Sequence, residues 1–179
     1  MAGLGAVNMI GESIASLLRT RRTLLGEENR LAPVPPSQDI AHVPLAKLTG
    51  TTPPSSGLSL TCYHIGRSDH TLPRGPMEDP SKGAGISLEL TYLLVSWSST
   101  AADELSLLSW AMLELNRYPV LGPGQLLGDG WGRDESVQIV PGAETAEQLA
   151  RVWDSLKVKY HLSTTFHARV VRIGYGRSE

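Results

Sequence analysis

The chain has 179 residues, of which 41% are hydrophobic and 19% charged, so it can bury a core of its own and does not have the composition of a disordered chain. Its 16 basic and 18 acidic residues give a formal net charge of -2, which argues against a nucleic-acid partner held by a general positive field. The single cysteine, Cys62, excludes an intrachain disulfide, and no apolar run approaches the roughly 18 residues of a membrane-spanning helix.

The first predicted element is a helix over residues 6–24. Its apolar residues recur at intervals of three and four and form one stripe: Val7, Ile10, Ile14, Leu17, Leu18 and Leu24. No signal peptide is expected before it, which suits a cytoplasmic protein. Residues 26–57 then form a proline-rich excursion, in which only residues 39–45 favour a short edge strand.

Two strands are predicted next, over residues 58–67 and 86–97, with a long polar turn at 68–84 between them. Alternation in the first strand places Leu58, Leu60, Cys62 and His64 on one face, opposite Tyr63 and Ile65. The second strand becomes apolar on both faces toward its end, so burial on both sides is expected there.

A second helix is predicted to begin at a cap formed by Ser99 or Thr100 and to end at Tyr118, before Pro119. Its expected core stripe consists of Leu105, Leu108, Met112 and Leu115. Leu107 and Trp110 flank this stripe, and we expect them to be free to contact a partner.

The remaining elements are a glycine-rich loop at 122–134, a short strand at 136–140, a helix that starts with a Thr145–Gln148 capping box, and a last strand at 163–175. This order predicts an α+β (mixed α/β) fold in one domain over residues 1–179. We expect one mixed or antiparallel sheet of four to five strands packed against two to three helices.

Catalytic, cofactor and metal sites are not expected. Cys62 and His64 are the best local pair for nucleophilic catalysis, but a buried core cysteine is the stronger interpretation. None of the five histidines has the helical spacing of a zinc site, and none of the Gly-x-Gly repeats fits a nucleotide-binding loop. A small-molecule-binding or hydrolytic α+β domain, with Cys62, His64 and Tyr92 lining a pocket, remains the alternative.

Taken in chain order, the predicted helices and strands resemble those of the tail-terminator or cap proteins of extracellular contractile injection systems, of the virulence-cassette and antifeeding-prophage type. The resemblance rests on the first helix, the strand at 58–64, residues 86–94 (ISLELTYLL), residues 113–121 (LELNRYPVL) and residues 149–165 (LARVWDSLKVKYHLSTT). The last block is the most specific of these. Residues 26–57 and the turn at 68–83 depart from the family pattern.

The resemblance implies a ring of six copies on the distal end of the particle, in contact with the inner tube and the contractile sheath, and it implies no catalytic residues. A tail-completion protein of a contractile phage is a further alternative, because it would also close the end of its polymer with a ring. We predict assembly in the cytoplasm into a particle that can be released, with contacts made by the loops at 26–57 or 122–134. The interface residues expected are Arg67, Arg74, Trp110, Trp131, Arg133, Arg169 and Arg172.

Overall fold

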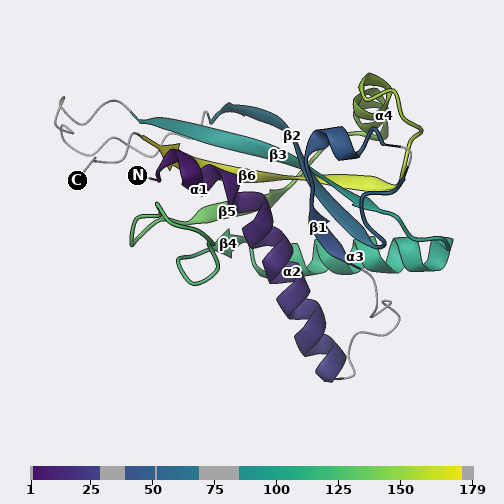
Figure 1. The fold of residues 1–179 in the computed structure, drawn as a ribbon, viewed down its shortest axis with the longest axis horizontal. Helices are drawn as coiled ribbons and strands as arrows, with labels where there is room; N and C mark the ends of the chain where they lie inside the picture. The colour runs from purple at the N-terminus through teal and green to yellow at the C-terminus, as the bar shows by residue number, and fades with distance from the viewer. Residues whose placement is uncertain (1, 29–38, 51, 69–84, 175–179) are drawn as a thin grey trace.

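The computed structural model describes residues 2–28, 39–50, 52–68 and 85–174, and these form one twisted sheet with helices on both faces (Figure 1). The helices are α1 (Leu4–Asn8), α2 (Ile10–Glu27), α3 (Ala101–Arg117) and α4 (Ala146–Ser155), with a 3-10 turn, η1, at Leu45–Lys47. The strands are β1 (Ile40–His42), β2 (Leu58–Arg67), β3 (Ile86–Ser96), β4 (Val120–Leu121), β5 (Val137–Pro141) and β6 (Ser163–Ile173).

The strands form a six-stranded mixed sheet in the order β1-β2-β3-β6-β5-β4. Only the β1–β2 pair is parallel; the other neighbours are antiparallel. The α+β class is confirmed, but the expected four to five strands and two to three helices are too few. The sequence missed β4 because two residues carry no alternation, and it missed the break at Met9 that separates α1 from α2.

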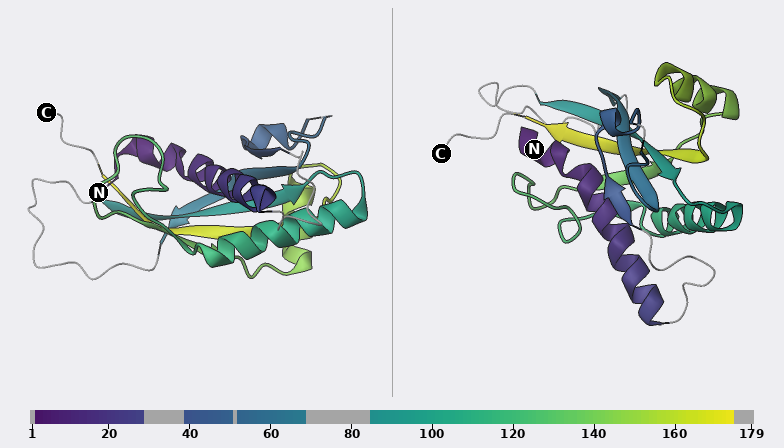
Figure 2. Two further views of the ribbon diagram at one scale, coloured as in Figure 1. Left: turned by 90° about the horizontal axis from the view of Figure 1, so that it is seen from below. Right: turned by 45° about the vertical axis from the view of Figure 1, so that its right-hand side comes forward.

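One face of the sheet is covered by α2 and α3, which lie in front of it when the molecule is seen from below (Figure 2). Side chains from both helices and from all six strands make the main core, in which Ile10, Ile14, Leu18, Leu60, Leu94 and Leu107 are completely buried. The stripe predicted for the first helix therefore faces the core, except for Leu24, which is 41% exposed.

The opposite face carries a smaller cluster, formed where α4 and η1 pack on β3. Leu93 and Val95 point into it from β3 and meet Leu48, Leu149 and Trp153. Because Leu90, Tyr92 and Leu94 point into the main core, β3 is buried on both faces, as its apolar end predicted.

Both predicted helix caps are confirmed, which fixes where α3 and α4 begin. The hydroxyl of Thr100 accepts a hydrogen bond from the backbone N–H of Asp103, so Thr100 rather than Ser99 is the cap. Thr145 and Gln148 form a reciprocal capping box, with distances of 2.8 and 3.3 Å between the paired atoms.

Candidate assembly interface

The outer side of α3 exposes large apolar side chains. Leu105 and Leu113 are each 56% exposed and Met112 is 47% exposed, while the neighbouring strand β4 adds Val120 at 45%. The predicted core stripe was therefore wrong at Leu105 and Met112. Instead α3 buries Leu107, Trp110, Ala111 and Glu114 together with Leu108 and Leu115.

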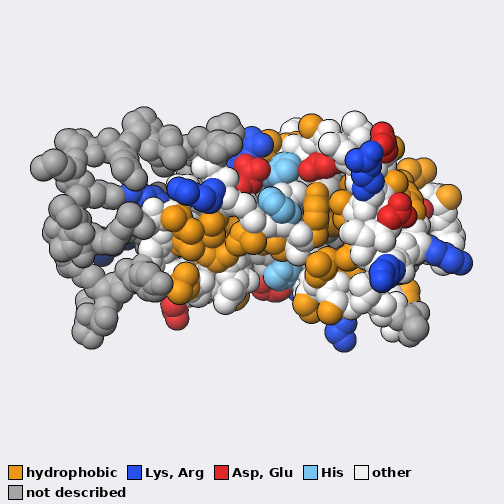
Figure 3. Space-filling view, turned by 90° about the horizontal axis from the view of Figure 1, so that it is seen from above, with side chains coloured by type: hydrophobic (Ala, Val, Ile, Leu, Met, Phe, Trp, Pro, Cys, Tyr) orange, Lys and Arg blue, Asp and Glu red, His pale blue; other side chains and the backbone are white. Residues whose placement is uncertain are grey.

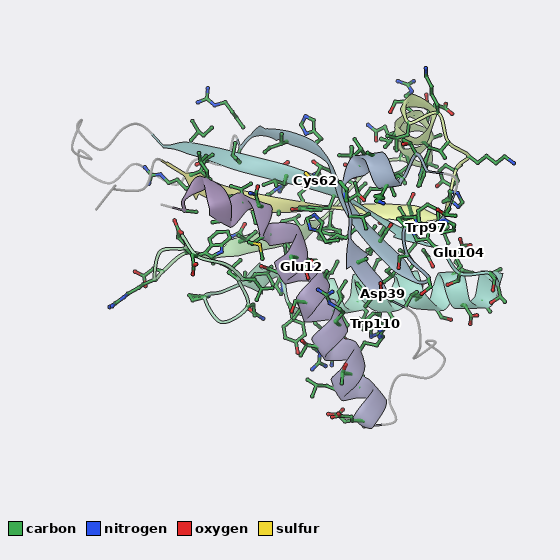
Figure 4. The ribbon with its side chains drawn as sticks, in the orientation of Figure 1. Glu12, Asp39, Cys62, Trp97, Glu104 and Trp110 are labelled. Atoms are coloured by element: carbon green, nitrogen blue, oxygen red, sulfur yellow. The ribbon has the colours of Figure 1, made fainter. Side chains whose placement is uncertain are left out.

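The reason is that α3 packs against α2 as well as against the sheet, which turns its buried arc by about one residue, or ~100°, from the predicted stripe. Trp110, expected at a partner surface, is only 7% exposed and lies on the side of α3 that faces α2 (Figure 4). It offers no surface to a partner in this structure. The apolar residues left outside are Leu105, Met112 and Leu113.

A groove of about 320 Å³ runs between the C-terminal half of α3 and the ends of β5 and β6, and we call it the α3 groove. Core residues Leu115, Ile139 and Phe166 line it together with the more exposed Met112 and Leu113. The rest of its lining is uncharged: Asn116, Pro141, Gly142, Thr164 and Thr165. A groove of this composition favours an apolar side chain over a charged ligand.

The sheet edge beside the α3 groove has few free hydrogen-bond donors. The N–H of Ile139 donates to the carbonyl of Pro119 at 2.7 Å, Pro141 has no N–H, and the N–H of Gly142 donates to the carbonyl of Thr165 at 2.9 Å. An added strand needs main-chain donors and acceptors in alternation. The groove is therefore built to accept side chains rather than a strand.

A polar cluster occupies the other face of the sheet. The two ring nitrogens of His167 lie 3.4 Å from a carboxylate oxygen of Glu89 and 3.5 Å from one of Glu144. Arg169 donates to Glu89 at 2.7 Å, so an ion pair joins β3 and β6, and His167 lies between them and Glu144 in the segment before α4. In Figure 3 histidine side chains gather in the middle of the face seen from above, beside acidic ones. Glu89, Glu144 and Arg169 therefore each have a side-chain partner among the described residues.

The residues of the hydrolytic alternative do not converge. A β-bulge at Tyr63 shifts the register, so that Cys62 pairs with Tyr92 whereas His64 pairs with Thr91 and lies on the opposite face. The predicted common face of Cys62 and His64 was therefore wrong. Burial raises the pKa of the Cys62 thiol, which is the opposite of what a cysteine nucleophile requires. In the described part of the chain, no three His, Cys, Asp or Glu side chains are placed to hold a metal ion.

Burial also raises the pKa of two tyrosines near Cys62: Tyr63, which follows it in β2, and Tyr92, which lies opposite it on β3. The pKa of Tyr63 rises to about 12, through burial and then through the nearby carboxylate of Glu144. Burial of Tyr92, whose ring stacks on Phe166 at 5.4 Å between centroids, raises its pKa further. Both phenol groups are therefore neutral at ordinary pH, that of Tyr92 in the main core and that of Tyr63 beside Glu144.

The sequence profile of the Pvc16 N-terminal domain family matches residues 10–179. This chain belongs to that family. The match confirms the resemblance to tail terminators of extracellular contractile injection systems. No curated protein sequence matches the chain.

Two solved structures share the fold of this Pvc16 N-terminal domain. The sheath/tube terminator of the PVC extracellular contractile injection system, in its extended state, matches with a TM-score of 0.50, 16% identity and coverage of 89% of this chain and 57% of that one. The tube-terminating cap of the anti-feeding prophage matches with a TM-score of 0.54, 15% identity and coverage of 87% and 55%. This chain thus spans a little over half the length of either protein.

The predicted interface residues of this Pvc16 N-terminal domain do not form one surface. Arg67, Arg169 and Arg172 lie near the same end of β3, but Arg169 is paired with Glu89 and Arg172 is also engaged. Trp131 is half-buried and donates its indole N–H to the carbonyl of Leu127, while Arg133 is exposed in the same loop. Arg74 lies outside the described residues.

The loop at 122–134 is tied to the N-terminal segment. Ser13 accepts a hydrogen bond from the N–H of Leu127 at 2.8 Å, and Gly3 donates to the carbonyl of Gly130 at 2.8 Å. Gly128 has a φ of +85°, and a Cβ there would lie 2.6 Å from Cγ of Met9. Much of this loop therefore contacts its own chain, although Asp129, Arg133 and Asp134 remain exposed.

The sequence contains a signal for the exposed apolar side of α3, which the assumption of a single core-facing stripe did not detect. Residues 105–115 hold more apolar side chains than a single core-facing stripe uses, so some had to point outward. No helix in the described part of the chain is long and apolar enough to cross a membrane.

Proposed function

We propose that this protein is a structural terminator that caps the end of the inner tube and sheath of a contractile injection particle. The observation that carries the proposal is the family match over residues 10–179, supported by the shared fold with a sheath/tube terminator and a tube-terminating cap. The raised pKa of Cys62 and its separation from His64 support a role without catalysis.

The role has a simple physical basis. A helical polymer presents at its last layer the same unsatisfied surface that every subunit offers to the next, and growth ends when a closed ring covers it. We propose six copies in that ring, assembled in the cytoplasm and carried on a particle that can be released. The exposed apolar side of α3 is the kind of surface that such an assembly buries.

Deleting the gene tests the proposal. Without its terminator, the tube should grow to irregular lengths and the sheath should fail to stay attached, and electron microscopy of purified particles would measure both. Expression of the wild-type protein in trans should restore one sharp length. Particles of normal length and sheath content in the deletion strain would rule the role out.

A further inference from the structure

A second pocket lies between η1 and the segment that follows α4, on the side of the sheet that carries the smaller hydrophobic cluster. We call it the α4 pocket. Its volume is about 220 Å³, below the ~300 Å³ at which pockets for drug-sized ligands begin, so its size suits one side chain of a partner. Leu48, Pro53 and Trp97 give it apolar walls, and its two ionisable lining residues, Lys159 and His161, are both bases.

The aromatic wall of the α4 pocket is fixed by contacts within the chain. Trp97, just past the end of β3 (Figure 4), donates its indole N–H to the hydroxyl of Ser59 at 2.7 Å. The imidazole of His161 lies against Trp97, with 4.6 Å between ring centroids, and against Trp153, with 5.4 Å. Neither ring nitrogen of His161 is hydrogen-bonded to another described residue, so the pocket is formed in advance and has a polar group to offer.

Unpaired positive charge surrounds the α4 pocket. All three described lysines lie in the two segments that border it, Lys47 in η1 and Lys157 and Lys159 after α4, and all three are exposed. None of them forms an ion pair with a described residue, although Asp154 is only three positions from Lys157. Arg151 on α4, in contrast, is paired with Glu147 at 2.6 Å. Such a surface favours an acidic partner.

Lys157 occupies a backbone position that ordinarily selects glycine. Its φ is +57°, in the left-handed region, just past the end of α4. Its N–H donates to the carbonyl of Asp154 at 3.0 Å, and the N–H of Val158 donates to that of Trp153 at 3.5 Å. These two bonds are the pattern of a helix end closed by glycine. A lysine there costs stability, and a strained residue beside a pocket points to a use for its side chain.

We infer that the α4 pocket receives a glutamate side chain from an acidic segment of the polymer that this protein caps. The inference rests on the proposed function and names a contact by which the cap holds its polymer. The methylene groups of the glutamate pack on Trp97, and its carboxylate meets Lys159 and His161. Lys47 and Lys157 attract further acidic residues of the same segment.

Carbodiimide cross-linking of purified particles tests the contact directly, because this reagent joins an amine to a carboxylate that touches it. Mass spectrometry of the digested particles should find Lys159 linked to a glutamate of a tube or sheath subunit. A link only to another copy of this chain would overturn the inference. So would a Lys159 that stays unlinked and reacts freely with an acetylating reagent in the intact particle.

A pair of matched substitutions measures the contribution of the pocket. Lys159→Gln and Arg151→Gln each remove one exposed positive charge, but only Lys159 lines the pocket and only Arg151 has an acidic partner of its own. Binding of the full-length protein to uncapped particles from the deletion strain should weaken about fivefold or more for Lys159→Gln and less than about twofold for Arg151→Gln. Circular dichroism melting checks that both variants fold, and equal effects of the two would contradict the inference.

Lys157→Gly separates binding from folding. Glycine relieves the left-handed backbone, so the melting temperature should rise by about 2 °C. The loss of the ammonium group should at the same time weaken binding to uncapped particles by about twofold or more. A variant that is more stable and binds as tightly as the wild type would show that Lys157 is not part of the contact.

The two proposals fail in different ways. If the gene deletion leaves tube length unchanged, the terminator role fails whatever the cross-links show. If the deletion alters tube length while Lys159→Gln protein binds and caps like the wild type, the role stands and the assignment of the α4 pocket is wrong.

Discussion

His42 packs directly against Gly11, where α2 crosses β1. A Cβ built on Gly11 would lie 2.3 Å from Nε2 of His42, so only glycine allows this approach. The imidazole is half-buried, and burial lowers its pKa, opposed in part by the nearby carboxylate of Glu12. The folded state therefore favours the neutral ring.

This lowered pKa predicts a dependence of stability on pH. In the unfolded chain His42 binds its proton at a pKa of about 6.5, whereas in the folded protein it does so only at lower pH. The free energy of unfolding should therefore fall as the pH drops from about 7 to 5, and His42→Gln should make that fall smaller. Urea denaturation at several pH values measures it.

His64→Gln is the matched control for this experiment, because His64 is exposed on β2. It leaves the packing of His42 against Gly11 intact. A His42→Gln variant with the wild-type slope between pH 7 and 5 would show that His42 does not contribute.

At the scale of elements, α2 and α3 are joined by an ion pair whose acid is almost completely buried. Nε of Arg21 donates to Glu114 at 2.9 Å, and Glu114 is 1% exposed, with Arg117 as a weaker second partner at 3.6 Å. This hydrogen bond raises the pKa of Arg21, whose guanidinium also lies over the ring of Tyr118. The pair fixes how α3 is rotated against α2.

Arg21→Ala should destabilise the protein by about 2–3 kcal/mol, because the Glu114 carboxylate would remain buried without its main partner. Arg19 lies two residues away on the same helix and pairs with Glu12 in an exposed position, so Arg19→Ala should cost less than about 1 kcal/mol. Chemical denaturation compares the two.

Adding Glu114→Gln to Arg21→Ala should recover part of the loss, because a neutral amide is less costly to bury than an unpaired carboxylate. An unchanged stability in the double variant would contradict the assigned role of the buried charge.

The same contact explains how far the elements could be predicted. Local signals identified the starts of α3 and α4, since Thr100 and the Thr145–Gln148 pair act within one turn. The rotation of α3 depends on Glu114 meeting Arg21, 93 positions away, which no local pattern contains. For the same reason Leu105 was expected inside and Trp110 outside, and the α3 groove was not found.

At the scale of the whole molecule, the two hydrophobic clusters share β3, whose side chains alternate between them. Trp153 is 1% exposed at the centre of the smaller cluster, and its indole N–H donates to Ser163 at 3.0 Å. Trp153→Ala should lower the free energy of unfolding by about 3–5 kcal/mol. Because β3 is common to both clusters, unfolding should remain one cooperative transition.

Calorimetry measures both quantities, by the position of the transition and by the ratio of calorimetric to van't Hoff enthalpy. Tyr160→Ala is the control, since Tyr160 touches Trp153 but is 50% exposed and should matter little. A separate early transition in Trp153→Ala protein would show that the α4 side unfolds independently.

The α+β class of the sheet was predicted correctly, but its number of strands was not. Alternation revealed β2, β3, β5 and β6, while β4 and the bulge at Tyr63 arise from pairing between strands and have no local pattern. Among the expected interface residues, charge and aromatic character were the only guides. They do not tell a residue that contacts its own chain, such as Arg169, from one that faces outward.

The two prolines beside the outermost strands have a further effect. Pro119 precedes the two-residue edge strand β4 and Pro141 ends the neighbouring strand β5, so neither position has a main-chain N–H to offer a foreign strand at this border of the sheet. Proteins whose sheet borders stay open tend to aggregate edge to edge. A molecule proposed to halt the growth of others is thereby protected from seeding fibres of its own.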